Sequence, residues 1–126
     1  MDRKKQNNLV IIVEDDPDIA ELIKLVAEQN KCRVKICNDG NKAEKLIKKE
    51  MPFLIFMDLW IPGLDGSKLA KKLKSFNKTK NIPIIITSAQ NSLDKIVAKS
   101  GADGFLSKPF NIKSIILLIN KYLKQT

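Results

Sequence analysis

The sequence predicts an α/β protein built on a doubly wound, five-stranded parallel sheet. Continuous apolar runs, typical of strands that are buried on both faces, alternate along the chain with segments of helical periodicity. The connections between these segments are short, so a strand followed by a helix occurs five times. Repeated (βα) units of this kind form a parallel sheet with helices on both of its faces.

The first strand–helix unit has the clearest local signals. The apolar run in NLVIIVED (8–15) predicts a buried strand that ends in acidic residues. Asp16 and Pro17 then supply a helix N-cap and a proline at the first helical position. Apolar residues follow at helical spacing, which predicts a helix after Pro17.

The second unit has the character of a sheet edge. CRVKIC (32–37) predicts a short strand whose two basic residues share one face, as suits an edge strand. Asp39 and Gly40 predict a turn into a helix over 41–50. The alternation then continues with strands at 53–57, 82–87 and 104–107, and with helices at 66–76, 92–100 and 112–125.

Length and composition bound the domain organisation. The 126 residues fit one domain, 1–126, with a short charged tail at 1–7, and 44% hydrophobic residues exclude a disordered chain. No apolar run approaches the roughly 18 residues of a membrane span, and the N-terminus does not have a signal-peptide pattern. We therefore expect a cytoplasmic protein without a membrane partner.

The two cysteines are too far apart to form a disulfide with each other. In a strand, Cys32 and Cys37 would have their Cα atoms about 16 Å apart, whereas a disulfide requires less than about 7 Å. We expect free thiols in a reducing compartment.

The charge balance is strongly basic. The formal net charge is +9, from 23 Lys and Arg against 14 Asp and Glu. This balance fits nucleic acid, an acidic partner or simply a solvated lysine-rich surface. Arg3 and Arg33 are the only arginines. Arginine is the side chain that most often recognises a base through two hydrogen bonds, so no direct nucleic-acid binding is expected. The chain has no histidine, which excludes mechanisms that use a histidine base or ligand.

Charged and polar residues follow the ends of the predicted strands. Glu14 and Asp15 end the first strand, Asp58 the third, Thr87 the fourth and Lys108 the fifth. In an open parallel sheet, ligands bind at the carboxyl ends of the strands, near the point where the strand order reverses. If the first and third strands are neighbours, these carboxylates crowd into one crevice and face a hydroxyl and an ammonium group.

Crowded carboxylates repel one another and need a compensating charge. Hard oxygen ligands suit Mg²⁺, and a carboxylate beside Mg²⁺, a lysine and a hydroxyl is arranged to accept a phosphoryl group. The simpler alternative is that each acid caps the next helix, as Asp16 is expected to do. That alternative fits Asp58 poorly, because Pro62 and Gly63 intervene before any helix.

Four segments carry a resemblance to a known family: VEDD (13–16), MDLWIPGLDG (57–66), IIITSA (84–89) and GADGFLSKPF (101–110). The chain resembles a response-regulator receiver domain of the single-domain, chemotaxis-regulator kind, over nearly its whole length. The resemblance implies a flavodoxin-like strand order of 2-1-3-4-5.

By position, the resemblance implies that Asp58 is the phosphoacceptor. Glu14 and Asp15 would hold Mg²⁺ together with Asp58, and the backbone carbonyl of Trp60 would be a further ligand. Thr87 and Lys108 would bind the phosphoryl oxygens.

Further features are implied around the fifth strand. The bond before Pro109 would be cis. Phe105 would be the aromatic switch residue that responds to Thr87, the alternative being ordinary core packing. Trp60, which is large for its position, would shield the aspartyl phosphate from water and prolong its life; the alternative is that it packs on the loop or meets a partner.

The implied function is that of a response regulator in a two-component phosphorelay. A sensor histidine kinase or phosphotransfer protein would supply the phosphoryl group, and the surface of the fourth helix, fifth strand and fifth helix would then contact an unknown output protein. Lys95, Lys99 and Lys113 make that surface basic and suited to an acidic partner. The chain would be a monomer or weak dimer, and not an enzyme beyond its own phosphorylation and dephosphorylation.

Three alternatives stay open. A haloacid-dehalogenase-like phosphatase also uses a strand-end aspartate and Mg²⁺, but it needs a second aspartate where this chain has Trp60. A receiver-like module could act in protein interaction without phosphorylation. The chain could also be the receiver part of a longer DNA-binding regulator or hybrid kinase.

Overall fold

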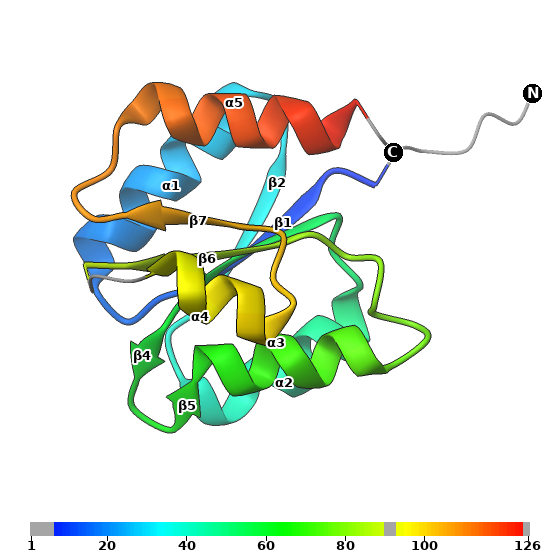
Figure 1. The fold of residues 1–126 in the computed structure, drawn as a ribbon. Coiled ribbons are helices and arrows are strands. Elements are labelled where there is room, and N and C mark those ends of the chain that lie inside the picture. Colours follow the sequence, from blue (N-terminus) through cyan, green and yellow to red (C-terminus); the bar gives the residue numbers. More distant parts are fainter. Residues whose placement is uncertain (1–6, 90–92, 125–126) are drawn as a thin grey trace, which may run out of the picture.

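The computed structural model describes residues 7–89 and 93–124. Five parallel strands form the main sheet in the order β2-β1-β3-β6-β7, and a separate two-stranded hairpin, β4-β5, projects from it (Figure 1). The strands of the sheet are β1 (Leu9–Val13), β2 (Arg33–Cys37), β3 (Leu54–Asp58), β6 (Ile84–Ser88) and β7 (Gly104–Ser107). Since the hairpin takes the labels β4 (Trp60–Ile61) and β5 (Leu64–Asp65), this order is the predicted 2-1-3-4-5.

Helices cover both faces of the sheet, as the sequence predicts. Figure 1 shows α1 and α5 on one face and α2, α3 and α4 on the other. The helices are α1 (Pro17–Gln29), α2 (Gly40–Glu50), α3 (Gly66–Ser75), α4 (Leu93–Ser100) and α5 (Ile112–Leu123). The doubly wound fold is therefore confirmed.

The central strands are apolar throughout because both of their faces are covered. Along β1, Val10 and Ile12 pack into the core under α1 and α5, whereas Ile11 and Val13 pack into the core under α2 and α3. Side chains of a strand alternate between its faces, so a strand between two helical layers needs an unbroken apolar run. This is the physical reason for the runs from which the strands were predicted.

The edge strand β2 is more exposed, as its basic residues indicated. Arg33 and Lys35 are exposed there, and Lys35 forms an ion pair with Glu50 of α2 at 3.1 Å. Cys32 and Cys37 are both buried free thiols, which confirms that they do not bridge. Burial raises the pKa of the Cys32 thiol.

Some boundaries differ from the sequence prediction. The fourth strand of the sheet begins at Ile84 and not at Ile82, because Pro83 has no backbone N–H to donate to a ladder. Asp39 is the N-cap of α2 and Gly40 is its first residue, so the predicted turn is the start of the helix. The β4-β5 hairpin was not predicted.

Of the predicted tail at 1–7, only Asn7 lies within the described residues, and its side chain donates a hydrogen bond to the Met51 carbonyl at 2.8 Å. Within 7–89 and 93–124, no helix is long and apolar enough to cross a membrane.

Lys74 joins α3 to the start of β6 and to the loop before β7. Its side chain is only 17% exposed, and its ammonium donates to the Ile82 carbonyl at 2.8 Å and to Asp103 Oδ2 at 2.7 Å. Asp103 Oδ2 in turn accepts from the Ile84 N–H at 2.8 Å. One lysine of α3 therefore pairs with groups from two other segments.

Lys74→Met should lower the free energy of unfolding by about 1–3 kcal/mol, because the Ile82 carbonyl loses this donor and Asp103 loses its ion pair. The melting temperature should fall by about 2–13 °C for a domain of this size. Urea unfolding measures the change, with Lys71→Met, an exposed lysine on the same helix, as the control. Equal effects of the two substitutions would contradict this role.

Candidate functional site

Neighbouring strands bring the predicted site residues together at the carboxyl edge of the sheet. β1 pairs with β3 and β3 with β6, so Asp58 lies directly beside Thr87 in the ladder. Glu14 directly follows β1, and its backbone N–H donates to the Cys37 carbonyl of β2 at 3.1 Å. The N–H of Lys108 donates to the Ser88 carbonyl of β6 at 3.0 Å, which fixes the segment after β7 at the same edge.

Three carboxylates meet there. Glu14, Asp15 and Asp58 each offer a carboxylate oxygen, and these atoms lie within 4.8 Å of one another. Glu14 and Asp58 are buried, with 2% and 7% of their surface exposed, whereas Asp15 is exposed. The crowding that the sequence predicted is therefore present.

Lys108 joins the two buried acids. Its ammonium lies 3.1 Å from Glu14 Oε1 and 3.3 Å from Asp58 Oδ2. The sequence predicted that Lys108 faces the group of carboxylates, but not which of them it pairs with. The contact with Glu14 follows from β1 lying beside β3, which periodicity alone does not fix.

The electrostatics of the site follow from burial and mutual charge. Burial raises the pKa of Glu14 above its usual value, and the negative charge of Asp58 raises it further, against the opposing hydrogen bond from the Asp16 N–H and the attraction of Lys108. Burial alone would lower the pKa of Lys108, but Glu14 and Asp58 outweigh it, so this pKa is raised. The ammonium form of Lys108 is thus stabilised by the acids beside it.

The donor set fits a hard divalent cation. Among the described residues, Glu14 Oε1 is a buried side-chain oxygen whose contact with the Lys108 ammonium, at 3.1 Å, is an ion pair that lacks hydrogen-bond geometry. A buried acceptor in this state is costly unless a further positive charge meets it. Three carboxylates with one solvent-exposed member provide oxygen ligands and access for water, which is what Mg²⁺ requires.

The loop between β3 and α3 is held close to this cluster. The Gly66 N–H donates to the Leu59 carbonyl at 2.8 Å, and a Cβ at Gly66 would lie 2.5 Å from the Asp58 carbonyl oxygen. Trp60 pairs with Asp65 across the hairpin, and Asp65 caps α3 through the N–H groups of Ser67 and Lys68. Asp65, not Asp58, is therefore the helix cap. The role of the Trp60 carbonyl as a metal ligand stays a prediction.

The residues assigned to the switch differ in burial. Thr87 is buried at the end of β6, whereas the Phe105 side chain on β7 is 43% exposed. Core packing therefore does not describe Phe105. The bond between Lys108 and Pro109 is cis, as predicted.

Gly66 is a functional position that sequence reasoning missed. It allows the first turn of α3 to lie against the backbone of Asp58. The Asp65-Gly66 pair could have indicated this position. Such a pair is typical of a turn, but it is also typical of a helix cap followed by a residue that lies close to another backbone segment.

Fold and cluster together define a doubly wound α/β protein with an acidic site at the carboxyl ends of β1 and β3. The family model of the response regulator receiver domain matches residues 10–120. The chain belongs to this family.

Relatives with curated descriptions agree. The chain is 37% identical over 118 residues to the response regulator GtcR of Aneurinibacillus migulanus, covering 92% of this chain and 48% of that protein. It is 32% identical over 119 residues to the DNA-binding dual master transcriptional regulator RpaA of Synechocystis, covering 93% and 49%. The chain thus spans about half the length of the curated relatives it matches.

Solved structures give the same family. The receiver domain of the Francisella response regulator 1452 is 36% identical, with a TM-score of 0.84 and coverage of 94% of this chain and 98% of that one. A response regulator from Chloroflexus aurantiacus is 29% identical, also with a TM-score of 0.84, and covers 93% and 98%.

MgCl₂ should raise the melting temperature above that in NaCl of equal ionic strength, because a cation among three carboxylates binds the folded state. At ten times its Kd, a single bound ion stabilises by about 1.4 kcal/mol, or about 3–6 °C. Asp15→Asn should reduce this shift, and Asp18→Asn, an exposed acid outside the cluster, should leave it intact. Differential scanning calorimetry provides the measurement, and equal melting temperatures in both salts would contradict the cation site.

Proposed function

We propose that this chain is a phosphorylated signalling switch of a two-component system, which accepts a phosphoryl group on Asp58 from a phosphohistidine donor. The observation that carries the proposal is the position of Asp58: buried at the end of β3, within 4.8 Å of two further carboxylates and 3.3 Å from the Lys108 ammonium. Family membership supports the same assignment.

The transfer would use the groups already at the site. A carboxylate oxygen of Asp58 forms the bond to phosphorus while the bond from phosphorus to the donor imidazole nitrogen breaks, and the released imidazole takes a proton from solvent. Lys108, held at 3.1 Å from Glu14, is placed to contact the charge on the phosphoryl oxygens. Thr87, beside Asp58 in the ladder, contributes a hydroxyl donor.

Glu14, Asp15 and Asp58 would hold Mg²⁺, with the Trp60 carbonyl as a further ligand. When bound, the cation would neutralise charge on the acceptor and on the incoming group. The site would need this cation because one ammonium group, that of Lys108, faces two buried acids.

The output surface of the proposal comprises α4, β7 and α5. Added negative charge at Asp58 would draw Thr87 and Lys108 toward it, and Phe105, on the strand beside β6, would respond. A sensor histidine kinase or phosphotransfer protein would donate the phosphoryl group, and an output protein would bind the switched surface. The 1–126 domain would act in the cytoplasm as a monomer or weak dimer, with no enzymatic activity beyond its own phosphorylation and dephosphorylation.

A second candidate is that the chain is the receiver part of a longer regulator. The observation that favours it is coverage: the curated relatives are about twice as long, and one is named a DNA-binding regulator. In that case the output surface would act on a further domain of the same protein.

Incubation with acetyl phosphate and Mg²⁺ should add one phosphoryl group to the protein, as measured by intact mass. The Asp58→Asn variant and a chelated sample should show no gain, because the nucleophile or the cation is missing. Asp65→Asn, an acid of the same loop outside the cluster, is the control that should still gain mass. A gain that survives Asp58→Asn would place the acceptor elsewhere.

Trp60→Asn should speed loss of the phosphoryl group several-fold. The indole is 57% exposed on β4, two residues from the acceptor, where its bulk would limit the approach of water. Trp60→Phe keeps a large ring and should retain most of the slow rate. Release of inorganic phosphate after removal of the donor gives the rate constants, and identical rates for Asn, Phe and the parent chain would remove the shielding role.

A further inference from the structure

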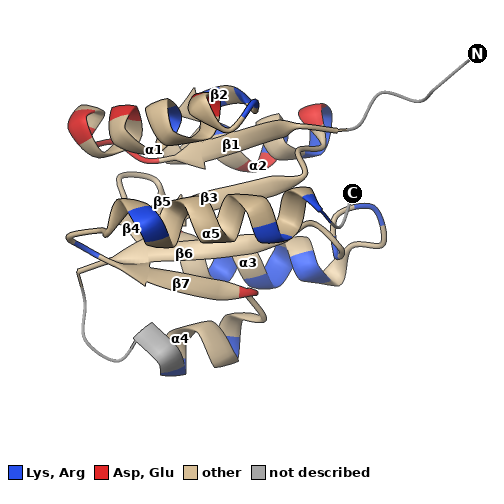
Figure 2. Cartoon of the chain, turned by 90° about the horizontal axis from the view of Figure 1, so that it is seen from above, with Lys and Arg blue, Asp and Glu red and all other residues tan. Residues whose placement is uncertain are grey.

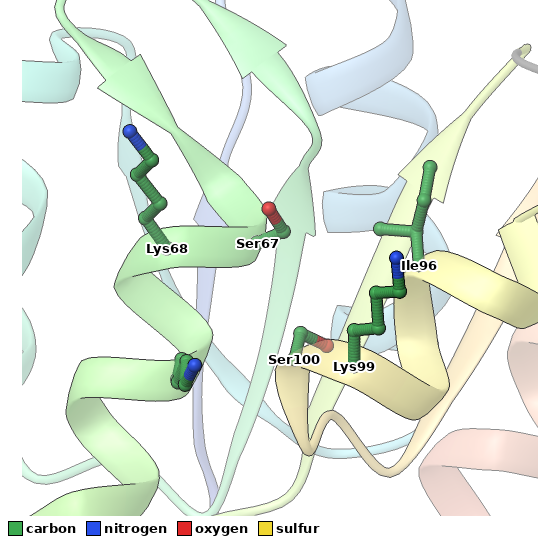
Figure 3. A pocket seen from close by; sticks show the side chains of 6 residues that line it. Ser67, Lys68, Ile96, Lys99 and Ser100 are labelled. Carbon is green, nitrogen blue, oxygen red and sulfur yellow. The ribbon is translucent and has the colours of Figure 1, made fainter.

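A pocket of about 240 Å³ lies between α3 and α4, outside the phosphorylation site. Figure 3 shows Ser67 and Lys68 on the α3 side and Ile96, Lys99 and Ser100 on the α4 side; Lys71 of α3 completes the lining. The part of the lining that the structure describes includes no carboxylate and none of the residues assigned to phosphoryl transfer.

Three lysines give the pocket its charge. Lys68 and Lys71 come from α3 and Lys99 from α4, and all three are exposed. Among the side chains that the structure describes, those of residues 7–89 and 95–124, no acid forms an ion pair with any of them. Like charges around a concave surface add to a positive potential that attracts an anionic ligand.

Three other lysines of α2 and α3 contact acids. Lys72 and Lys48 both form ion pairs with Glu44, at 3.1 and 2.7 Å, and Lys74 is held by Asp103. Lys68 and Lys71 therefore differ from Lys72 and Lys74 of the same helix, which have acidic partners.

The remaining lining contributes shape and one apolar wall. The Ser100 hydroxyl is buried, donates to the Val97 carbonyl and accepts from the Ala102 N–H, so it is already satisfied. The Ser67 hydroxyl donates to Asp65. Ile96 is half-buried and presents apolar surface between the lysines.

We propose that the α3–α4 pocket binds an acidic segment of a partner protein. Two or more carboxylates of the segment would pair with Lys68, Lys71 and Lys99, while an apolar side chain between them would lie against Ile96. The site shares α4, with Lys99, with the output surface of the proposed function and in this respect rests on it, but none of its lining residues takes part in phosphoryl transfer, so the two can be tested separately.

The lining favours an acidic peptide over a nucleic acid. It contains no aromatic side chain on which a base could stack, and no arginine to pair with phosphate in two hydrogen bonds. The described arginine, Arg33, lies on β2 and donates to Asn8. Figure 2 shows basic residues along α3 and acidic residues along α1.

The test uses the full chain and two fluorescent probes, an octapeptide of alternating Glu and Leu and a single-stranded oligonucleotide of eight nucleotides. Anisotropy gives the Kd of each, and ¹⁵N chemical shifts locate the bound peptide. The site variant is Lys71→Glu with Lys99→Glu. Its matched control is Lys45→Glu with Lys49→Glu, two exposed α2 lysines with the same change in net charge and no place in the pocket.

The site variant should weaken peptide binding about tenfold or more, since two attractive contacts become repulsive. The control should change it by less than about twofold. Shifts should be largest at Ser67, Ile96 and Ser100. If charge reversal unfolds the chain, Lys71→Gln with Lys99→Gln should still weaken binding more than the same change at Lys45 and Lys49.

Three results would overturn the proposal: equal weakening by site and control pairs, shifts centred on another face, or no peptide binding at millimolar concentration. Tighter binding of the oligonucleotide with the same lysine dependence would assign the pocket to nucleic acid and reject the acidic peptide. Phosphorylation of Asp58, measured in parallel by mass, should be unchanged by the site variant, so failure here is distinguishable from failure of the proposed function.

Discussion

Burial of Glu14 and Asp58 at the end of a parallel sheet is the constraint on which the rest of the site depends. Two carboxylates removed from water repel each other and lose hydration, at a cost of several kcal/mol per ion unless they are compensated. Lys108 compensates both, but a single ammonium leaves one negative charge in excess, and its contact with Glu14 Oε1 lacks hydrogen-bond geometry. The fold therefore holds a site with capacity for further positive charge, which a cation would supply in the proposed function.

Close backbone packing keeps that charge cluster in place. A Cβ at Gly40 would lie 2.5 Å from Leu64 Cβ, and one at Gly66 would lie 2.5 Å from the Asp58 carbonyl oxygen. The hairpin thus packs directly against the first turns of α2 and α3, and the loop that carries Asp58 lies against a helix. In the proposed function, such packing would help the Asp58 carboxylate to keep one geometry.

Much of this could be predicted from the sequence, for identifiable reasons. Strands that are covered on both faces need unbroken apolar runs, so β1, β3 and β6 could be predicted. The carboxyl ends of parallel strands lie at one edge of the sheet. The residues that follow these strands could therefore be grouped into one site: Glu14, Asp58, Thr87 and Lys108. The hairpin β4-β5 could not be predicted, since two-residue strands have no periodicity to detect. The contact between Lys108 and Glu14 depends on tertiary neighbours, and the exposure of Phe105 depends on β7 being an edge strand.

The two sites are joined through the elements that carry them. α3 begins at Gly66, directly after the loop of Asp58, and α4 follows β6, which ends beside Asp58 with Thr87 and Ser88. A pocket whose walls are α3 and α4 therefore rests on the two segments that flank the acceptor. If phosphorylation changes the separation of these helices, it changes the distance between Lys71 and Lys99 and hence the free energy of binding an acidic segment. Binding of that segment must then change the free energy of phosphorylation by the same amount. Comparison of the octapeptide Kd before and after phosphorylation measures that coupling free energy directly, and equal values would show that the two sites are energetically separate.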